Sequence, residues 1–320
     1  MCYLCMNYQQ QFEMKQIATI LTVFNRKQKT LSCLQHLFAA VETYNQNNEG
    51  KDGFSMTVFM TDDGCTDGTA DAVRTTFPEK AIHIVQGTGS LFWAGGMRKA
   101  WQAAINNGTP WDYYLLLNDD TNVYSNVFTE LFAADEYGYQ QTGKHGLSSG
   151  ITCQPMEEDK TTYGGFNYLS SAKLKAVIAV PTGKPQHVDL THANILLVHH
   201  NVTDSIGIFH KGYRHNSADF DYALSASRCG FPTMVTAKTC GECAYDHFSN
   251  EDEIRQLCQM SLNERKQYLN SPTRSDHDFL LFLRRNRPYR YPVTFVMRKI
   301  RLYCPQLYFG LNRMRGLYKS

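Results

Sequence analysis

The sequence lacks several features that would assign it to a particular class of protein. No apolar run approaches the roughly 18 consecutive residues of a membrane-spanning helix. The segment 1–16, which we expect to be an N-terminal extension, has neither the basic start nor the apolar centre of a secretory leader. Ten cysteines in 320 residues do not indicate a disulfide framework. We therefore expect a cytoplasmic protein whose cysteines remain thiols.

Acidic residues are absent from the last part of the chain. The segment 284–320 contains ten Arg and Lys residues and no Asp or Glu, in a chain whose net charge is +2, so the rest carries −8. Such an asymmetry indicates an anionic partner for one end of the molecule. Two amphipathic stretches, 293–300 and 302–311, predict helices that lie on an anionic membrane surface. A solvated helical extension is the alternative, and we expect no nucleic acid partner.

Two pairs of cysteines have the spacing of zinc ligands. Cys2 and Cys5 form one pair, and Cys240 and Cys243 form the other. Because most of the chain separates the two pairs, we interpret all four residues as unligated thiols and keep a zinc site as the alternative.

The remaining composition is that of a globular protein, with 42% hydrophobic and 19% charged residues. Short apolar runs alternate with stretches of helical periodicity. The predicted strands are 17–24, 54–61, 81–85 and 111–117, and the predicted helices between them are 31–44, 66–77 and 97–105. This alternation favours an α/β fold with a mostly parallel, doubly wound sheet flanked by helices.

An acidic turn follows the second predicted strand. Asp62 and Asp63 precede Gly64, and Asp67 follows shortly afterwards. Carboxylates at this position can accept hydrogen bonds from a nucleotide base or ribose, and glycine lets the backbone approach a ligand closely. A plain Asp-Gly turn is the alternative interpretation.

A glycine-rich segment, 87–98, follows the third predicted strand. It is not a dinucleotide-binding fingerprint, because Phe92 replaces the third glycine and the segment does not follow the first strand. Gly95 and Gly96 open the next predicted helix, whose N-terminal end could admit a diphosphate or a sugar. A packing turn is the alternative. Trp93 could stack on a sugar, although we interpret it as a core residue.

Three polar residues follow the fourth predicted strand, at the edge of the sheet where α/β proteins bind ligands. In an extended backbone, Asn118 and Asp120 face one side and Asp119 faces the other. Amide and carboxylate oxygens suit a hard divalent cation, which would neutralise a departing diphosphate. A solvated turn is the alternative.

In this order, the motifs resemble those of family 2 glycosyltransferases with the GT-A fold, and in particular bacterial rhamnosyl- and galactofuranosyl-type transferases of surface polysaccharide synthesis. The segment 22–26 resembles the turn after the family's first strand. The segment 62–69 matches the family's Asp-Asp-Gly-Ser-Thr-Asp-Gly-Thr motif except at Cys65. The segment 118–120 corresponds to its DxD motif, with Asn118 in the first position.

The resemblance implies roles for individual residues. The family's catalytic base corresponds to Asp219, and Asp221 is the alternative base. Asn118 and Asp120 would hold a divalent metal, Mn²⁺ or Mg²⁺, together with His247. The residues implied to bind the nucleotide-sugar are Thr22, Phe24, Arg26, Asp62, Asp63, Gly95, Gly96, Arg98 and Asp119.

The resemblance covers roughly residues 17–250 and suggests a division of the chain. We expect one GT-A domain over 17–278, with a nucleotide-sugar-binding half, 17–125, and an acceptor-binding half, 126–278. The segment 279–320 would be a basic amphipathic extension.

We therefore expect an inverting, metal-dependent glycosyltransferase. It would move a sugar from a nucleotide-diphosphate donor to a saccharide or lipid-linked acceptor, while a carboxylate removes the proton of the acceptor hydroxyl. The expected location is peripheral, on the cytoplasmic face of the membrane. A non-catalytic sugar- or membrane-binding protein is the alternative, because Asn118, Ala218 and Ser225 depart from the family pattern. A nucleotidyltransferase is less favoured, because the segment 22–26 contains no glycine.

Overall fold

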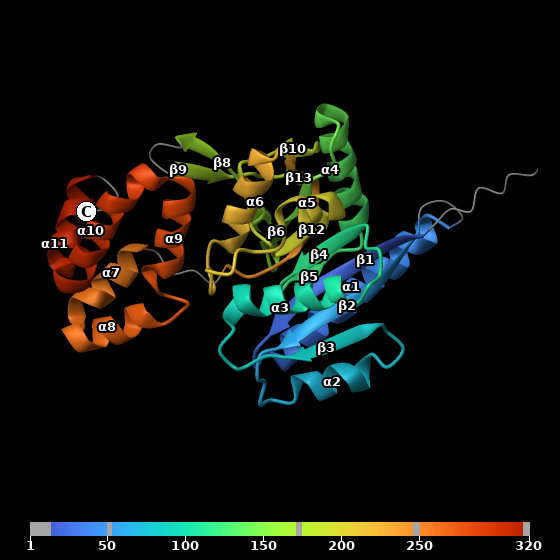
Figure 1. Ribbon diagram of the computed structural model, residues 1–320, viewed down its shortest axis with the longest axis horizontal. Coiled ribbons are helices and arrows are strands. Elements are labelled where there is room, and N and C mark those ends of the chain that lie inside the picture. The colour runs from blue at the N-terminus through green and yellow to red at the C-terminus, as the bar shows by residue number, and fades with distance from the viewer. Residues whose placement is uncertain (1–13, 50–52, 171–174, 246–249, 316–320) are drawn as a thin grey trace, which may run out of the picture.

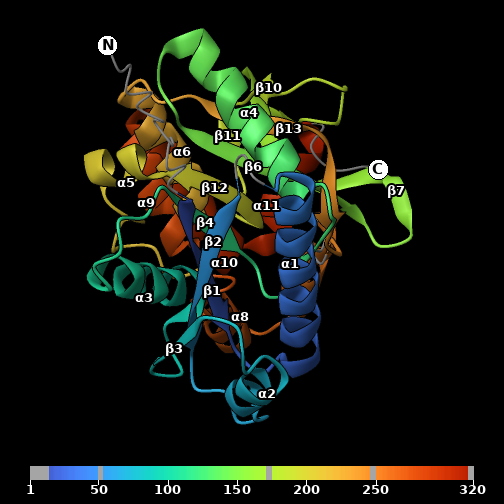
Figure 2. The ribbon, with the colours of Figure 1, turned by 90° about the vertical axis from the view of Figure 1, so that its right-hand side faces the viewer.

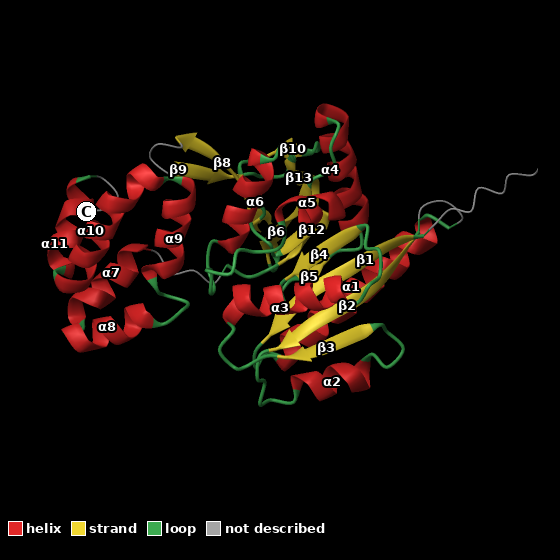
Figure 3. Ribbon diagram, viewed as in Figure 1, coloured by secondary structure: helices red, strands yellow, loops and turns green. Residues whose placement is uncertain are grey.

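The computed structural model describes residues 14–49, 53–170, 175–245 and 250–315. The described chain forms an α/β domain around a ten-stranded sheet, with a unit of helices at one end (Figure 1). In Figure 3 the strands lie together in the α/β domain, and the described part of the other end consists of helices and loops. The expectation of an α/β fold with a mostly parallel sheet is confirmed.

Four parallel strands form the first half of the sheet, in the order β3-β2-β1-β4. These strands are β1 (Lys15–Val23), β2 (Phe54–Asp62), β3 (Ile82–Gln86) and β4 (Tyr113–Leu117), and the helices between them are α1 (Lys27–Asn47), α2 (Thr69–Thr76) and α3 (Phe92–Asn106). Figure 2 shows this part of the sheet between α1 and α3. Leu115 of β4 belongs to the core that includes α1, and Leu116 belongs to the core that includes α3. Because both faces are covered, β4 is apolar throughout.

A reversed strand separates the two halves of the sheet. The strand β12 (Ile195–His199) lies between β4 and β6 (Leu147–Gln154) and is antiparallel to both. The strand β13 (Thr233–Glu242) is parallel to β6. Three further strands belong to this sheet: β10 (Gln186–His187) lies at the edge beside β13, β5 (Asn122–Val123) pairs with β13, and β7 (Glu157–Tyr163) pairs with β6. A separate three-stranded sheet consists of β8 (Gly165–Ser170), β9 (Lys175–Ile178) and β11 (Leu190–Thr191).

Helices cover both faces of the large sheet. The helix α4 (Val127–Thr142) shares the core that contains α1. The helices α5 (His200–Ile206) and α6 (Ala218–Arg228) share the core that contains α3. This arrangement places the N-terminus of α6 on the same side of the sheet as α3.

The helical unit at the end of the chain has a small core of its own. It consists of α7 (Asn250–Gln259), α8 (Leu262–Asn270), α9 (Asp276–Asn286), the 3₁₀ turn Pro288–Arg290, α10 (Tyr291–Tyr303) and α11 (Pro305–Met314). Ile254, Leu257 and Leu269 form the buried part of this core. In Figure 1, α10 and α11 lie at the outer end of the unit, and α9 lies nearest to the α/β domain.

The helical unit also packs directly against the α/β domain. Phe282 and Leu283 of α9 are buried in the core that contains α3 and α6. The expected boundary at residue 279 therefore falls inside a helix that packs on the sheet domain. Within the described ranges, no helix has the length and apolar character needed to cross a bilayer.

The glycine at position 96 lets α3 pack closely on β1. A Cβ atom added to Gly96 would collide with the hydroxyl and Cβ of Thr22. The Gly96 carbonyl also accepts a hydrogen bond of 2.8 Å from Thr61 Oγ1. Close packing on β1 therefore requires a small residue here.

We predict that Gly96→Ala lowers the free energy of unfolding by about 2 kcal/mol, because the added methyl group separates α3 from β1. Unfolding in urea, followed by circular dichroism, measures the change. The control is Gly310→Ala in α11, where an added Cβ meets no described atom within 4 Å apart from its own helix backbone. That variant should be at least as stable as the wild type, since alanine favours helix over glycine. A wild-type urea midpoint for Gly96→Ala would contradict the prediction.

Candidate functional site

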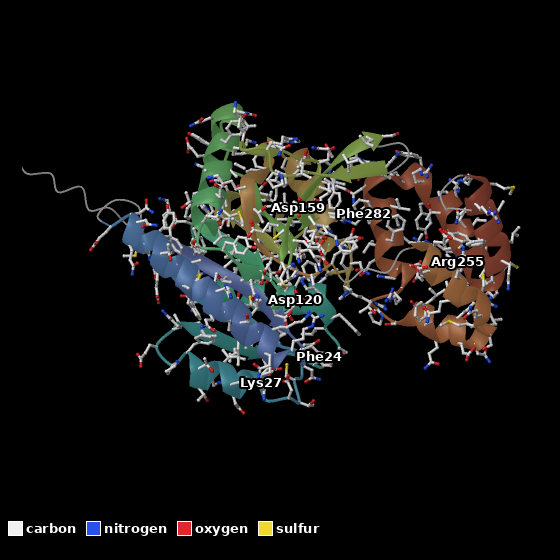
Figure 4. All side chains as sticks on the ribbon, turned by 180° about the vertical axis from the view of Figure 1, so that it is seen from behind. Phe24, Lys27, Asp120, Asp159, Arg255 and Phe282 are labelled. Carbon is white, nitrogen blue, oxygen red and sulfur yellow. The ribbon has the colours of Figure 1, made fainter. Side chains whose placement is uncertain are left out.

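A cavity of about 600 Å³ lies at the carboxyl ends of β1 and β4 and extends to the N-terminus of α6. Of the residues proposed from the sequence, Thr22, Phe24 and Arg26 line it at and after the end of β1, and Asn118, Asp119 and Asp120 line it just after β4. Asp63, after β2, and Asp219, in α6, line it as well. Figure 4 shows Phe24 and Asp120 near the strand ends. The fold thus brings together residues from four separate parts of the chain.

Arg26 bridges the two carboxylates that follow β4. Its Nη1 atom lies 2.7 Å from Asp120 Oδ2 and 3.3 Å from Asp119 Oδ1. Lys29 Nζ lies 4.0 Å from the same oxygen of Asp120. Burial raises the pKa of the Asp119 carboxyl to about 7, although the Arg26 charge opposes this shift. This end of the cavity therefore combines two carboxylates with two cationic side chains.

The described side chains supply enough ligands for a divalent cation only if substrate phosphates bind the cation as well. Asn118 Oδ1 already accepts a hydrogen bond of 2.7 Å from Trp93 Nε1. In the described part of the chain, no three His, Cys, Asp or Glu residues are arranged to hold a metal ion. His247 lies outside the described residues. Asp120 lines the cavity, and Mg²⁺ is commonly held by one or two carboxylates plus substrate phosphates.

Asp63 lines the cavity, but its carboxylate is occupied by the glycine-rich segment. Oδ1 accepts hydrogen bonds from the N–H groups of Thr88 and Gly89, at 3.1 and 2.9 Å. Oδ2 accepts those of Leu91 and Phe92, at 2.9 and 3.1 Å. Phe92 has a φ of 56°, which is rare for a bulky residue. The geometry supports Asp63 as the organiser of this wall and leaves few acceptor sites for a nucleotide.

Four other residues that the resemblance assigns to the nucleotide-sugar are not among the described residues that line the cavity; they are Asp62, Gly95, Gly96 and Arg98. Asp62 is buried, and its Oδ1 accepts a backbone hydrogen bond from the following turn. Gly96 packs against Thr22. Arg98 Nη1 donates a hydrogen bond of 2.8 Å to the carbonyl of Tyr213. The packing interpretation of the glycine pair therefore agrees with the geometry.

Asp219 is a buried carboxylate that lines the cavity from the first turn of α6. Its Oδ1 accepts a hydrogen bond of 2.9 Å from Phe220 N, and its Oδ2 accepts one of 3.2 Å from Ala193 N. Burial raises the pKa of Asp219 to about 6, and these backbone donors limit the shift. A carboxyl group with this pKa can accept a proton near neutral pH.

Asp221, the alternative base, is bound by α9 and is not among the described lining residues. Arg285 Nε lies 3.0 and 3.1 Å from its two oxygens. Asn286 Nδ2 donates a further hydrogen bond of 2.6 Å to Oδ1. This carboxylate therefore connects α6 to α9.

Aromatic side chains form the wall beside Asp219, and the sequence did not predict most of them. Tyr163, His192 and Phe220 line the cavity, and the His192 ring lies 5.1 Å from each of the other two rings. Tyr163 and His192 belong to a region without a regular hydrophobic pattern, so no sequence signal placed them here. Phe220 could have been found from its position next to Asp219. Trp93, which we interpreted as a core residue, also lines the cavity.

The sequence matches no protein-family model and no curated protein. Solved structures share its fold at low identity. The mannosyltransferase PcManGT from Pyrobaculum calidifontis, in complex with GDP-Man and Mn²⁺, gives a TM-score of 0.50 at 14% identity, over 96% of this chain and 82% of its own. S. aureus TarS 1-349 in complex with UDP-GlcNAc gives 0.51 at 13% identity, over 92% and 78%. The protein therefore has the fold of these glycosyltransferases, as expected from its sequence.

Proposed function

We propose that the protein is an inverting family 2 glycosyltransferase. It moves a sugar from a nucleotide-diphosphate donor to a hydroxyl group of a saccharide or lipid-linked acceptor, in surface polysaccharide synthesis. The observation that carries this proposal is the composition of one cavity, which contains Arg26 and Asp120 at the strand ends and the buried carboxylate of Asp219 in α6. The fold shared with two structures that contain a nucleotide-sugar supports it.

The donor occupies the strand ends of the cavity. Arg26 and Lys29 supply positive charge beside Asp120, where the diphosphate carries its negative charge. Phe24 is 53% exposed and lines the cavity, so its ring is available to stack on the nucleotide base. Both features suit a ligand with an aromatic base and an anionic diphosphate.

A divalent cation, Mn²⁺ or Mg²⁺, completes the donor site. Asp120 would hold it together with the diphosphate, and Asn118 Oδ1 would contribute the lone pair that its hydrogen bond from Trp93 leaves free. When bound, the cation neutralises charge on the departing diphosphate. Arg26 contacts the same carboxylate and assists in this neutralisation.

Asp219 acts as the general base at the other end of the cavity. A hydroxyl group is a weak nucleophile, so its proton must be transferred as it attacks the anomeric carbon. The N–H groups of Ala193 and Phe220 hold the carboxylate in place for this transfer. A base on the face opposite the leaving diphosphate inverts the configuration of the anomeric carbon.

Asp219→Asn should lower the rate of sugar transfer by about a hundredfold or more, because the amide cannot accept the proton. In the wild type, the transfer rate should rise with pH through about 6, as the Asp219 carboxyl loses its proton. Rates measured between pH 5 and pH 8, with the donor that gives turnover in a nucleotide-sugar panel, test both statements.

The matched control is Asp221→Asn, a buried carboxylate of the same helix. It should lower stability, because it breaks the ion pair with Arg285, but the dependence of the rate on pH near 6 should remain. Wild-type transfer by Asp219→Asn would exclude Asp219 as the base, and loss of the pH dependence only in Asp221→Asn would assign the base to Asp221.

Metal binding should depend on the nucleotide. We expect Mn²⁺ alone to leave the melting temperature unchanged, and Mn²⁺ with UDP or GDP to raise it by about 5 °C at saturating concentrations. Asp120→Asn should remove the part of this rise in melting temperature that requires Mn²⁺. The control is Asp71→Asn, at an exposed residue that pairs with Arg74, and this variant should show the full rise. Stabilisation by Mn²⁺ without nucleotide would contradict the proposed site.

The outer face of the helical unit binds the membrane. Large apolar side chains are exposed there; they are Val293, Phe295, Val296 and Tyr303 on α10 and Leu307 and Met314 on α11. Val293, Val296 and Tyr303 share one face of α10 with the exposed Lys299. Exposed cations follow on α11 and after it, at Arg313 and Arg315. Apolar residues mixed with cations, without an acidic residue in the segment 284–320, fit an anionic lipid surface on the cytoplasmic side.

Binding to phosphatidylcholine vesicles should require added phosphatidylglycerol and should weaken with salt. Val293→Asp with Val296→Asp should reduce binding in a flotation assay by about tenfold or more, since acidic residues replace apolar contacts. The control carries Val177→Asp and Val180→Asp, two exposed valines at the same spacing near β9, and should bind normally. Equal binding by both variants, or a concentration-dependent dimer lost only in the first, would refute the membrane assignment.

A further inference from the structure

The helical unit has a buried carboxylate that binds a segment of the α/β domain. Asp278 of α9 is 1% exposed. Its Oδ2 accepts hydrogen bonds from the N–H groups of His215 and Asn216, at 2.7 and 2.9 Å. The N–H group of Arg214 lies 3.2 Å from both oxygens. Three consecutive amides of one segment are therefore held by a single side chain from a distant part of the sequence.

The segment held by Asp278 is a wall of the candidate active site. His215, Asn216 and Ser217 line the cavity, and α6 begins at the next residue. Ser217 has a φ of 63°, a left-handed conformation that costs free energy in a residue other than glycine. Its carbonyl accepts a hydrogen bond of 3.0 Å from Asp221 N, in the first turn of α6. The conformation of this segment therefore determines where the first turn of α6, with Asp219, lies.

The opposite side of the segment is bound by α3. The carbonyl of Arg214 accepts a hydrogen bond of 3.1 Å from Ala94 N, and the carbonyl of Tyr213 accepts one of 2.8 Å from Arg98 Nη1. The segment thus lies between α3, next to the donor end of the cavity, and α9. The contacts to α3 are made by carbonyl groups, whereas the N–H groups of 214–216 are bound by Asp278 of α9.

Helix α9 also binds α6 directly. Arg285 and Asn286 hold Asp221, and Asn286 Oδ1 accepts a hydrogen bond of 2.7 Å from Arg228 at the other end of α6. Contacts before, within and at the end of α6 therefore all come from one helix of the helical unit.

We infer that Asp278 is a positioning residue, which orders the segment 214–217 and thereby places Asp219 for catalysis without touching the substrate. The inference rests on the proposed function for the role of Asp219. A carboxylate that accepts several backbone hydrogen bonds can be replaced by an amide only with loss of some of them, because the amide nitrogen donates and repels the N–H groups. The strained conformation at Ser217 then favours relaxation of the segment.

The test compares Asp278→Asn with Asp276→Asn. Asp276 belongs to the same helix, but it pairs with Arg298 and Arg301 inside the helical unit, each at 3.0 Å. Hydrogen–deuterium exchange read by mass spectrometry should show the amides of 214–216 exchanging about tenfold faster or more in Asp278→Asn. The Asp276→Asn protein should keep wild-type exchange in this segment.

Kinetics separate positioning from a general loss of structure. We expect Asp278→Asn to lower kcat for transfer by about tenfold or more, with the donor KM within a factor of two of wild type. Asp276→Asn should keep wild-type kcat even where its melting temperature is the lower of the two. Unchanged exchange at 214–216 in Asp278→Asn, or unchanged kcat, overturns the inference.

The experiments distinguish a failure of the proposed function from a failure of the inference about Asp278. If the wild type turns over no donor of the panel, the assignment as a glycosyltransferase is wrong, whereas exchange at 214–216 still decides whether Asp278 orders the segment.

Discussion

Buried carboxylates that accept backbone hydrogen bonds hold the walls of the cavity in place. Asp63 binds the N–H groups of the segment 88–92, and Asp278 binds those of 214–216. A buried charge is tolerated only where donors surround it, and a buried N–H group requires an acceptor. Each carboxylate and its segment therefore depend on one another. The helix α3, which begins at the end of the first segment, also donates a hydrogen bond from Ala94 N to the carbonyl of Arg214, so the two walls are connected.

The sequence predicted the parallel half of the sheet because its signals are local. The apolar run of β4 and the periodicity of the helices identify elements, and the order of these elements brings the strand ends to one edge. The contacts of Asp278 are not local, since its partners lie more than sixty residues away in the chain. No periodicity in the sequence indicates such a pairing, and the sequence alone places the end of the GT-A domain at this residue. A glycine pair such as Gly95 and Gly96 is also ambiguous, because ligand contact and close helix packing both require a small residue.

Net charge read from a sequence does not equal the charge that a surface presents. Several of the basic residues in the segment 284–320 form ion pairs within the protein: Arg285 pairs with Asp221, and Arg298 and Arg301 pair with Asp276. The structure thus divides the basic residues into a set that holds helices together and an exposed set beside apolar side chains on α10 and α11. Only the second set can attract an anionic surface, and its attraction is screened by salt.

The reversed strand β12 has a consequence for how the chain is synthesised and folded. The strands β1 to β4 are complete once residue 117 has been made, but one edge of β4 pairs with β12, which ends at residue 199. Until then, five consecutive apolar residues present unsatisfied backbone groups at an open edge. A nascent or truncated chain that stops before Ile195 therefore carries an exposed edge that can pair with another copy. The open edge of β4 is therefore covered only after the chain has been made as far as β12.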